Sequence, residues 1–255
     1  MCRFKNYWVS KKMETNSNQY KWEKYYDGLD SLMSPNEYLL KCLCGKYESK
    51  TDFIKNKSWR DAFINDKALD LSCGDGRNII LLDKLGFQTY ATEITDSICA
   101  KVQNNLIKNG INIETSRIKS GLNNDIPFDD NFFNFVISWN GIYYLNDDKH
   151  SILDNFKEVH RVLKNDSYFI CSLPGPKCYS LMGATEIGPD IVEINPLVNG
   201  GWGGKLLNKT ILHRFPNEDD LQKKLERYFN GIEISELFWD GFGVPLHYYI
   251  FICKK

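Results

Sequence analysis

The stretch Asp70-Leu71-Ser72-Cys73-Gly74-Asp75-Gly76-Arg77-Asn78 decides the fold. An apolar run at residues 68–71 leads into it, and apolar residues at helical spacing follow it at 79–85. This order predicts a strand, a tight turn and a helix. Gly74 and Gly76 have no Cβ, so the turn can adopt positive φ angles and a ligand can approach the backbone. Free N–H groups at the helix start favour an anionic group, so we expect the first strand–helix turn of a nucleotide-binding sheet.

Two common nucleotide motifs do not fit this turn. The NAD-type fingerprint needs a third glycine three residues after the second, and Ile79 occupies that position. A phosphate-binding P-loop needs Gly-Lys-Ser or Gly-Lys-Thr, which does not follow. Glu93 ends the next expected strand, where a carboxylate can accept both hydroxyls of a ribose. The alternative for Glu93 is a solvated acid at the strand end.

Length and composition place the chain in a broad class. With 255 residues, 42% of them hydrophobic, it can bury the core of one large α/β domain, with or without an insertion. The net charge is −1 without a long basic run, so neither nucleic acid nor a membrane surface is expected as a partner. The eight cysteines include no CxxC pair, which argues against zinc. Without a signal-peptide pattern, we expect reduced thiols and a cytoplasmic protein.

Strands and helices alternate through the middle of the chain. This alternation predicts a parallel sheet with right-handed crossovers, whose ligand binds at the carboxyl ends of the strands. The expected strands cover residues 67–72, 87–93, 113–119, 133–139 and 168–173, and the expected helices cover residues 77–85, 96–109 and 150–164.

The two ends of the chain depart from this alternation. Residues 1–60 are interpreted as an N-terminal helical lid segment, with Ser34 as a helix N-cap. Its aromatic run at 20–27 either covers the cofactor or packs on the sheet. Residues 61–255 are the main domain, with a Gly- and Pro-rich insertion at 174–212 that would cover the acceptor site. A helix at 217–229 and two strands at 231–239 and 246–253 are expected to complete the chain.

The glycine turn resembles the first motif, D-x-G-x-G-x-G, of the class I S-adenosylmethionine (SAM)-dependent methyltransferases. Ser72 stands where this motif has its first glycine, and Leu122 stands where the family usually has an aspartate that contacts adenine. The stretches 126–128 and 134–136 match the region that follows that aspartate. A [D/N]-P-P-[Y/F] motif at 138–144 would indicate transfer to a base or glutamine nitrogen, and it is absent.

The resemblance implies a Rossmann-like α/β fold: a seven-stranded, mostly parallel sheet with helices on both faces and an antiparallel C-terminal hairpin. It implies SAM as the cofactor, S-adenosylhomocysteine as the product, and no metal. The cofactor-binding residues are expected to be Trp22, Tyr26, Asp70, Ser72, Gly74, Gly76, Asn78, Glu93, Ile94, Leu122, Asn123, Ser138 and Asn140.

Methyl transfer from a sulfonium needs alignment, exclusion of water and, for a hydroxyl acceptor, removal of a proton. The candidate catalytic residues are His213, His247 and Tyr144, although each histidine also fits a hydrogen-bonded structural role. Arg214, next to His213, either holds an acidic acceptor or forms a surface ion pair. The candidate acceptor-binding residues are Tyr143, Tyr179 and Arg214.

The sequence therefore predicts a methyltransferase of the EC 2.1.1 type that acts on a small polar molecule. A hydroxyl of a sugar or nucleotide-sugar, as in surface-polysaccharide synthesis, is the first expectation, on family likeness alone. An amine or a carboxylate of a small metabolite is the alternative acceptor. A SAM-binding protein without catalysis and a dinucleotide oxidoreductase are the alternative functions. The oligomeric state stays open, with a homodimer as one option.

Overall fold

The computed structural model describes residues 17–27, 34–44, 65–195 and 209–255, and every structural statement below concerns these residues. The strands of its main sheet are β1 (Lys67–Leu71), β2 (Gln88–Glu93), β3 (Ile118–Ser120), β4 (Phe133–Trp139), β5 (Leu163–Pro174), β9 (Asn230–Gly241) and β10 (Val244–Lys254).

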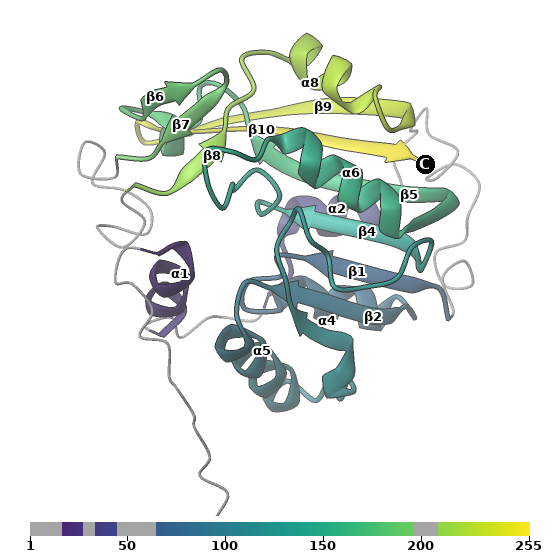
Figure 1. Ribbon diagram of the computed structural model, residues 1–255. Helices are drawn as coiled ribbons and strands as arrows, with labels where there is room; N and C mark the ends of the chain where they lie inside the picture. The colour runs from purple at the N-terminus through teal and green to yellow at the C-terminus, as the bar shows by residue number, and fades with distance from the viewer. Residues whose placement is uncertain (1–16, 28–33, 45–64, 196–208) are drawn as a thin grey trace, which may run out of the picture.

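The seven strands follow the order β3-β2-β1-β4-β5-β10-β9 (Figure 1). Strands β1 to β5 pair in parallel, whereas β10 runs antiparallel to both β5 and β9. Parallel neighbours need crossover segments, and helices provide most of them. The fold class predicted from the sequence, with its antiparallel C-terminal hairpin, is confirmed.

Helices cover both faces of this sheet (Figure 1). One face packs against helices α2, α4 and α5, and the other against α6 and α8. A short helix, α1, lies at the carboxyl end of the strands beside α5. The helices are α1 (Asn18–Asp27), α2 (Glu37–Cys44), α4 (Arg77–Lys84), α5 (Asp96–Lys108), α6 (Ile152–Val162) and α8 (Glu218–Leu225), with 3-10 turns η1 (Thr115–Arg117) and η2 (Tyr179–Leu181).

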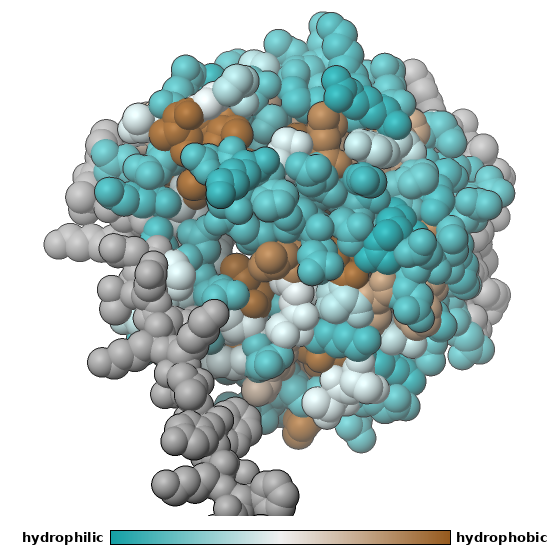
Figure 2. Space-filling view, viewed as in Figure 1, coloured by the Kyte–Doolittle hydropathy of each residue, from teal (hydrophilic) through white to brown (hydrophobic). Residues whose placement is uncertain are grey.

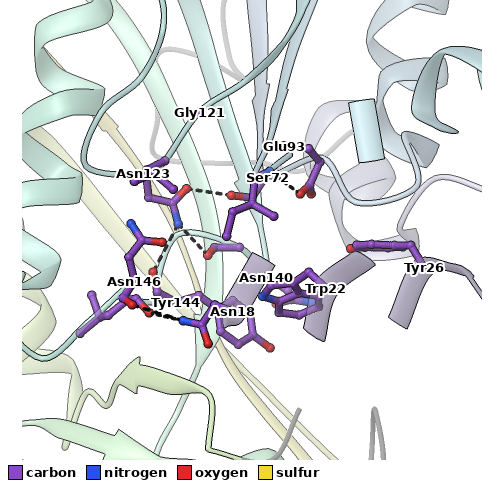
Figure 3. A pocket seen from close by; sticks show the side chains of 14 residues that line it. Asn18, Trp22, Tyr26, Ser72, Glu93, Gly121, Asn123, Asn140, Tyr144 and Asn146 are labelled. Atoms are coloured by element: carbon purple, nitrogen blue, oxygen red, sulfur yellow. Dashed lines mark hydrogen bonds between the residues drawn. The ribbon is translucent and has the colours of Figure 1, made fainter. Parts of the chain in front are cut away.

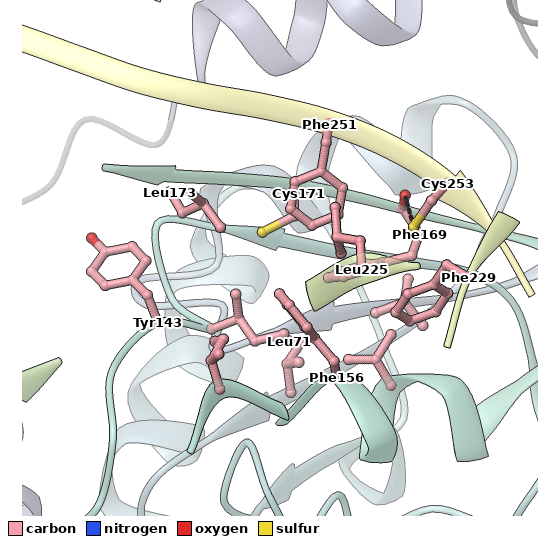
Figure 4. Close-up of a cluster of buried hydrophobic side chains, with 14 of the residues drawn as sticks. Leu71, Tyr143, Phe156, Phe169, Cys171, Leu173, Leu225, Phe229, Phe251 and Cys253 are labelled. Carbon is pink, nitrogen blue, oxygen red and sulfur yellow. Dashed lines mark hydrogen bonds between the residues drawn. The ribbon is translucent and has the colours of Figure 1, made fainter. Parts of the chain in front are cut away.

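The alternation of side chains along β1 explains the two-sided core. Leu69 and Leu71 belong to the cluster that contains Phe156 of α6, whereas Ala68 belongs to the cluster that contains Leu39 of α2. Successive strand residues point to opposite faces, so a strand covered on both faces is largely apolar, and in β1 the buried Asp70 next to the glycine turn is the exception. Figure 4 shows the α6 side, where Phe156 packs among aromatic and aliphatic side chains of β1, β5 and β10.

The predicted insertion at 174–212 contains a second sheet in its described part. This antiparallel sheet has three strands in the order β6-β7-β8, and its last strand extends past the predicted insertion. An isolated bridge between Tyr144 and Leu212 ties it to the loop after β4. Residues 196–208 lie outside the described part of the chain. The strands are β6 (Thr185–Gly188), β7 (Ile191–Glu193) and β8 (Ile211–His213).

Two local predictions were wrong. Helix α2 begins at Glu37, and Asn36 rather than Ser34 caps it, because the Asn36 side chain accepts hydrogen bonds from the Tyr38 and Leu39 amides. The strand expected at 113–119 is reduced to β3, because the 3-10 turn η1 takes up its first half.

The surface is mainly hydrophilic in the view of Figure 2, with a hydrophobic patch over the small sheet, where Ile187 of β6 is 44% exposed. Single apolar side chains of this kind are ordinary on protein surfaces. Within the described ranges, no helix is long and apolar enough to cross a membrane.

Candidate active site

The turn after β1 has the backbone geometry expected of a ligand-binding turn. Gly74 and Gly76 have φ angles of 64° and 87°, and Gly76 precedes the first residue of α4. Ser72 also adopts a left-handed conformation, with φ of 58°. The family's glycine at this position is thus replaced by a residue that holds the same backbone shape at a cost of about 1 kcal/mol.

Glu93 closes the other side of this turn. One carboxylate oxygen accepts the Gly74 amide at 2.7 Å and the other accepts the Ile94 amide at 2.9 Å. The side chain is only 7% exposed. Burial raises the pKa of Glu93 to about 7, although both amide hydrogen bonds favour the ionised form. The carboxylate keeps lone pairs beyond those that the amides use, so it can still accept ligand hydroxyls.

Asn123 joins the glycine turn to the loop after β4. The Ser72 hydroxyl donates to Asn123 Oδ1 at 2.7 Å, and Asn123 Nδ2 donates to the Gly141 carbonyl at 3.1 Å (Figure 3). Gly141 has no room for a side chain, because an added Cβ would lie 2.6 Å from the Ser72 Cβ. We call the set Ser72, Glu93, Asn123 and Gly141 the cofactor wall.

Helix α1 covers the same edge of the sheet. Asn18 Nδ2 donates to the Leu145 carbonyl at 3.2 Å, and Asp27 forms an ion pair with Lys101 of α5. Trp22 stacks on Tyr26, with ring centroids 6.0 Å apart. The Tyr26 hydroxyl lies 2.9 Å from where a Cβ on Gly74 would be, so Gly74 leaves room for the phenol. The aromatic run borders the pocket and also packs against the buried cluster of α4 and α5, so both roles considered from the sequence remain open.

A cavity that is partly open to solvent lies between α1 and the strand ends. Residues from both sides point into it (Figure 3). The sequence-predicted residues that line it are Trp22, Tyr26, Ser72, Glu93, Ile94, Leu122, Asn123, Asn140 and Tyr144.

The other predicted cofactor residues lie beneath or behind the pocket. Asn78 is buried and accepts the Asn36 amide at 3.1 Å, so it anchors α2 to α4. The Ser138 hydroxyl donates to the Leu71 carbonyl at 3.1 Å, and Gly76 faces Val102 of α5. These residues, with Asp70 and Gly74, do not line the cavity.

Neither candidate histidine lines the cavity. His213 is 4% exposed and packs edge-on against Phe215, and burial lowers its pKa to about 4. The ring of His247 packs against Gly175, accepts the Lys177 amide at Nδ1, and places Nε2 2.7 Å from Glu236. The hydrogen-bonded ring of His247 fits the structural role that the sequence left open, whereas His213 is buried with Nε2 unpartnered among the described residues.

The predicted acceptor residues also lie outside the lining set. Arg214 pairs with Glu186 of β6, which fits the surface ion pair considered from the sequence. Tyr143 is buried, and its hydroxyl is hydrogen-bonded to that of Tyr144. The ring of Tyr144 lies edge-on to Trp22, with centroids 5.0 Å apart.

Tyr144 belongs to a group of phenols that influence one another's titration. The pKa of Tyr144 rises to about 12, mainly through burial and partly through the nearby Tyr25. Burial also raises the pKa of Tyr179 and Tyr248, and Tyr144 adds to both shifts. We call Tyr25, Tyr143, Tyr144, Tyr179 and Tyr248 the tyrosine cluster. At neutral pH these phenols keep their protons, so Tyr144 acts as a hydrogen-bonding group and not as a base.

Sequence reasoning missed several residues that line the cavity. Gly121 and Gly141 lie inside stretches that resemble family motifs, so the motif pattern was a usable signal for them. The others depend on where α1 and the loop after β4 meet, and nothing local marks them. They are Asn18, Leu145 and Asn146.

Two buried carboxylates at the glycine turn each have one oxygen without a partner in the described ranges, although the other oxygen of Asp75 pairs with Arg77. Asp70 is 1% exposed and Asp75 is 5% exposed, and Oδ2 of each has no hydrogen-bond partner among the described residues. Burial and the neighbouring Glu93 raise the pKa of Asp70 well above its usual range. A cation or a hydrogen-bond donor near this turn would relieve these groups. Glu93 itself lines the cavity, so a ligand with a ribose, as SAM has, fits this edge of the pocket.

Comparison with known proteins agrees with this geometry. Residues 69–171 match a family model described as a methyltransferase domain. No curated protein matches the chain.

Solved structures share the fold at low sequence identity. A SAM-dependent methyltransferase from Methanosarcina mazei is 20% identical, with a TM-score of 0.56, over 75% of this chain and 92% of that one. A protein from Pyrococcus horikoshii is 19% identical, with a TM-score of 0.52, over 74% and 83% of the two chains. A putative methyltransferase from Bacillus halodurans is 13% identical, with a TM-score of 0.53, over 76% and 94%.

Residues 69–171 therefore match a methyltransferase domain, and the strand order and the glycine turn with Glu93 are consistent with the class I SAM-dependent methyltransferase fold. The matched domain supports a methyltransferase of the EC 2.1.1 type, for which SAM is the implied cofactor.

Proposed function

We propose that this methyltransferase transfers the methyl group of SAM to a nitrogen atom of a small polar acceptor that binds beside Tyr144. The observation that carries the proposal is the set of titratable groups in the cavity. Among the described residues that line it, these groups are Tyr26, Glu93 and Tyr144. Glu93 lies at the glycine turn, where we assign it to the ribose hydroxyls, and the two phenols have raised pKa values. Apart from Glu93, the described residues that line the cavity therefore include no side chain that could remove a proton from an acceptor at neutral pH.

A sugar hydroxyl, the acceptor first expected from the sequence, has to lose its proton as it attacks. Neither His213 nor His247 lines the cavity to take that proton. A hydroxyl acceptor is therefore the less favoured candidate.

A carboxylate needs no base, but it needs a positive partner when it leaves water. No lysine or arginine is among the described residues that line the cavity, and Arg214 is already paired with Glu186. A carboxylate acceptor is also disfavoured.

A neutral amine attacks with its own lone pair. The N–CH₃ bond forms as the S–CH₃ bond breaks, the electron pair of that bond stays on sulfur, and the new ammonium group then releases its proton to water. Trp22 and Tyr144 offer aromatic rings that can stabilise such a cation by cation–π attraction. The amide side chains of Asn18, Asn140 and Asn146 also line the cavity and suit polar groups of the acceptor.

The test uses SAM with a ¹³C-labelled methyl group and three acceptors on one scaffold: an amino sugar, its parent sugar and the corresponding uronic acid. A pool of small cellular metabolites serves as a fourth arm. The carbon chemical shift of the product distinguishes N-methyl, O-methyl and methyl-ester groups. We expect only N-methyl signals. An O-methyl or ester signal that depends on active enzyme would contradict the nitrogen assignment, and SAM binding without any labelled product would favour a protein that does not catalyse transfer.

A further inference from the structure

A second group of ligand-type side chains lies outside the cofactor cavity, between the small sheet and α8. Asp190 precedes β7, His213 ends β8, and Asp220 lies in the first turn of α8. Each offers one ligand atom, and these atoms lie within 4.8 Å of one another. The three side chains therefore come together where the small sheet packs against α8.

Two of these side chains have buried atoms without a partner. His213 is 4% exposed, and its Nε2 has no hydrogen-bond partner among the described residues. Oδ2 of Asp220 is likewise buried and unpartnered. A buried polar atom without a partner is unfavourable, and a bound cation is one way to satisfy both atoms at once.

Lys224, which lies next to these three side chains, leaves one oxygen of each carboxylate free to bind an ion. Lys224 Nζ lies 3.2 Å from Oδ2 of Asp190 and pairs with Oδ1 of Asp220. It therefore contacts one oxygen of each carboxylate, and one positive charge faces two negative charges. The ammonium group and a metal ion would compete for the same carboxylates.

We propose that Asp190, His213 and Asp220 form a binding site for a divalent transition-metal ion of the Zn²⁺ class. One imidazole nitrogen and two carboxylates, with water as a fourth ligand, make a donor set that suits such ions. Tetrahedral coordination places ligand atoms about 3.5 Å apart, so the side chains need only small shifts to close around the ion. The ion joins β8, the turn before β7 and α8. Its role is structural and separate from methyl transfer, for which the sequence predicts no metal.

The experiment measures Zn²⁺ binding to the chelator-treated full chain by calorimetry, with Co²⁺ absorption as a second readout of the ligand geometry. We expect Asp220→Asn, which keeps the side-chain shape, to weaken binding at least about tenfold, since a neutral amide is a poor ligand. His213→Gln is a second loss variant. Lys224→Gln removes the competing ammonium group, so it should strengthen binding. His150→Ala is the matched control, because His150 also lies beside an aspartate, Asp147, but away from the group.

Thermal unfolding without metal shows whether each variant is folded. Saturating Zn²⁺ should raise the melting temperature of the wild-type chain by about 5 °C, because the ion binds the folded state alone. The same rise should be absent in Asp220→Asn. The proposal is overturned if the wild-type chain binds no Zn²⁺ at micromolar concentration. It is equally overturned if folded Asp220→Asn and His213→Gln bind as tightly as the wild type, or if His150→Ala accounts for the binding.

Discussion

The cofactor wall takes its residues from the ends of neighbouring strands, whereas the tyrosine cluster draws on α1, the loop after β4, η2 and β10. In the first region, backbone amides, one carboxylate and one amide side chain fix the geometry. In the second, aromatic side chains meet only because distant parts of the chain fold together. Strand ends thus position the polar groups at the glycine turn, whereas tertiary packing brings the phenols together; in our proposal the first region holds SAM and Tyr144 of the second borders the acceptor.

The largest effect is expected at the cofactor wall. Glu93→Ala removes the carboxylate assigned to the ribose hydroxyls, and each charged hydrogen bond contributes about 1.5–3 kcal/mol. The dissociation constant of SAM should rise at least about a hundredfold, as measured by calorimetry. Glu186→Ala, which removes an acid of the small sheet, should leave SAM affinity unchanged. Equal affinities for the wild type and Glu93→Ala would remove the ribose role.

A pair of glycines compares the packing of the cofactor wall with that of the small sheet. Gly141→Ala places a Cβ 2.6 Å from the Ser72 Cβ, and such overpacking costs about 1–3 kcal/mol of unfolding free energy. Gly188→Ala in the small sheet meets only ordinary contacts with Ile191 at 3.7 Å, so stability should hardly change. Urea denaturation measures both. Similar losses at the two positions would show that the cofactor wall is no more tightly packed than the small sheet.

A smaller effect is expected in the tyrosine cluster. Tyr144→Phe keeps the ring beside Trp22 but loses a hydroxyl that we place next to the acceptor. The KM for the acceptor should rise about fivefold, the equivalent of one neutral hydrogen bond, while SAM affinity stays the same. Tyr90→Phe, on β2 outside the cavity, is the control. A large change in SAM affinity instead would assign Tyr144 to the cofactor wall.

The smallest effect concerns the strained serine of the glycine turn. Ser72→Gly relieves a left-handed φ but loses the hydrogen bond to Asn123, and these terms of about 1 kcal/mol each nearly cancel. Unfolding free energy should stay within about 0.5 kcal/mol of the wild type. Ser72→Ala keeps the strain and loses the bond, so it should be less stable by about 1 kcal/mol. If Ser72→Gly is as destabilised as Ser72→Ala, the φ angle carries no strain.

The sequence predicted the central sheet because its signals are local. Apolar strands, glycine helix ends and the turn at 70–78 each act within a few residues, and β4 has the predicted bounds. The small sheet could not be foreseen, because strands as short as β7 and β8 leave almost no periodic pattern and are defined by their pairing. The cap of α2 was misplaced because Ser34 and Asn36 are both good cap residues two positions apart, and only the observed bonds decide between them.

The candidate site shows the same division. Glu93 and Ser72 line the cavity as expected, since their positions follow from strand ends. His213 and His247 were chosen for their chemistry alone, and their burial away from the cavity depends on packing that no motif encodes. Asn18 lines the cavity only because α1 lies over the strand ends, and Asn146 reaches it from the loop after β4.

The pH dependence of SAM binding tests the central claim, that the buried carboxylate of Glu93 receives the ribose. Its pKa of about 7 lies above the usual range, so the free protein holds a proton there at pH 6 and loses it by pH 8. Only the ionised form accepts both ribose hydroxyls, so binding should tighten as the pH rises through 7. Asp70, Asp75 and Tyr26 also face this carboxyl and remain in every variant. Glu93→Gln therefore isolates its contribution.

Calorimetry of SAM binding at pH 6 and pH 8, in the wild type and in Glu93→Gln, makes this measurement. The account predicts affinity about tenfold higher at pH 8 in the wild type, from the change in ionised fraction, and weak, pH-independent binding in Glu93→Gln. Equal pH profiles for the two proteins, or wild-type affinity that falls as the pH rises, would contradict it.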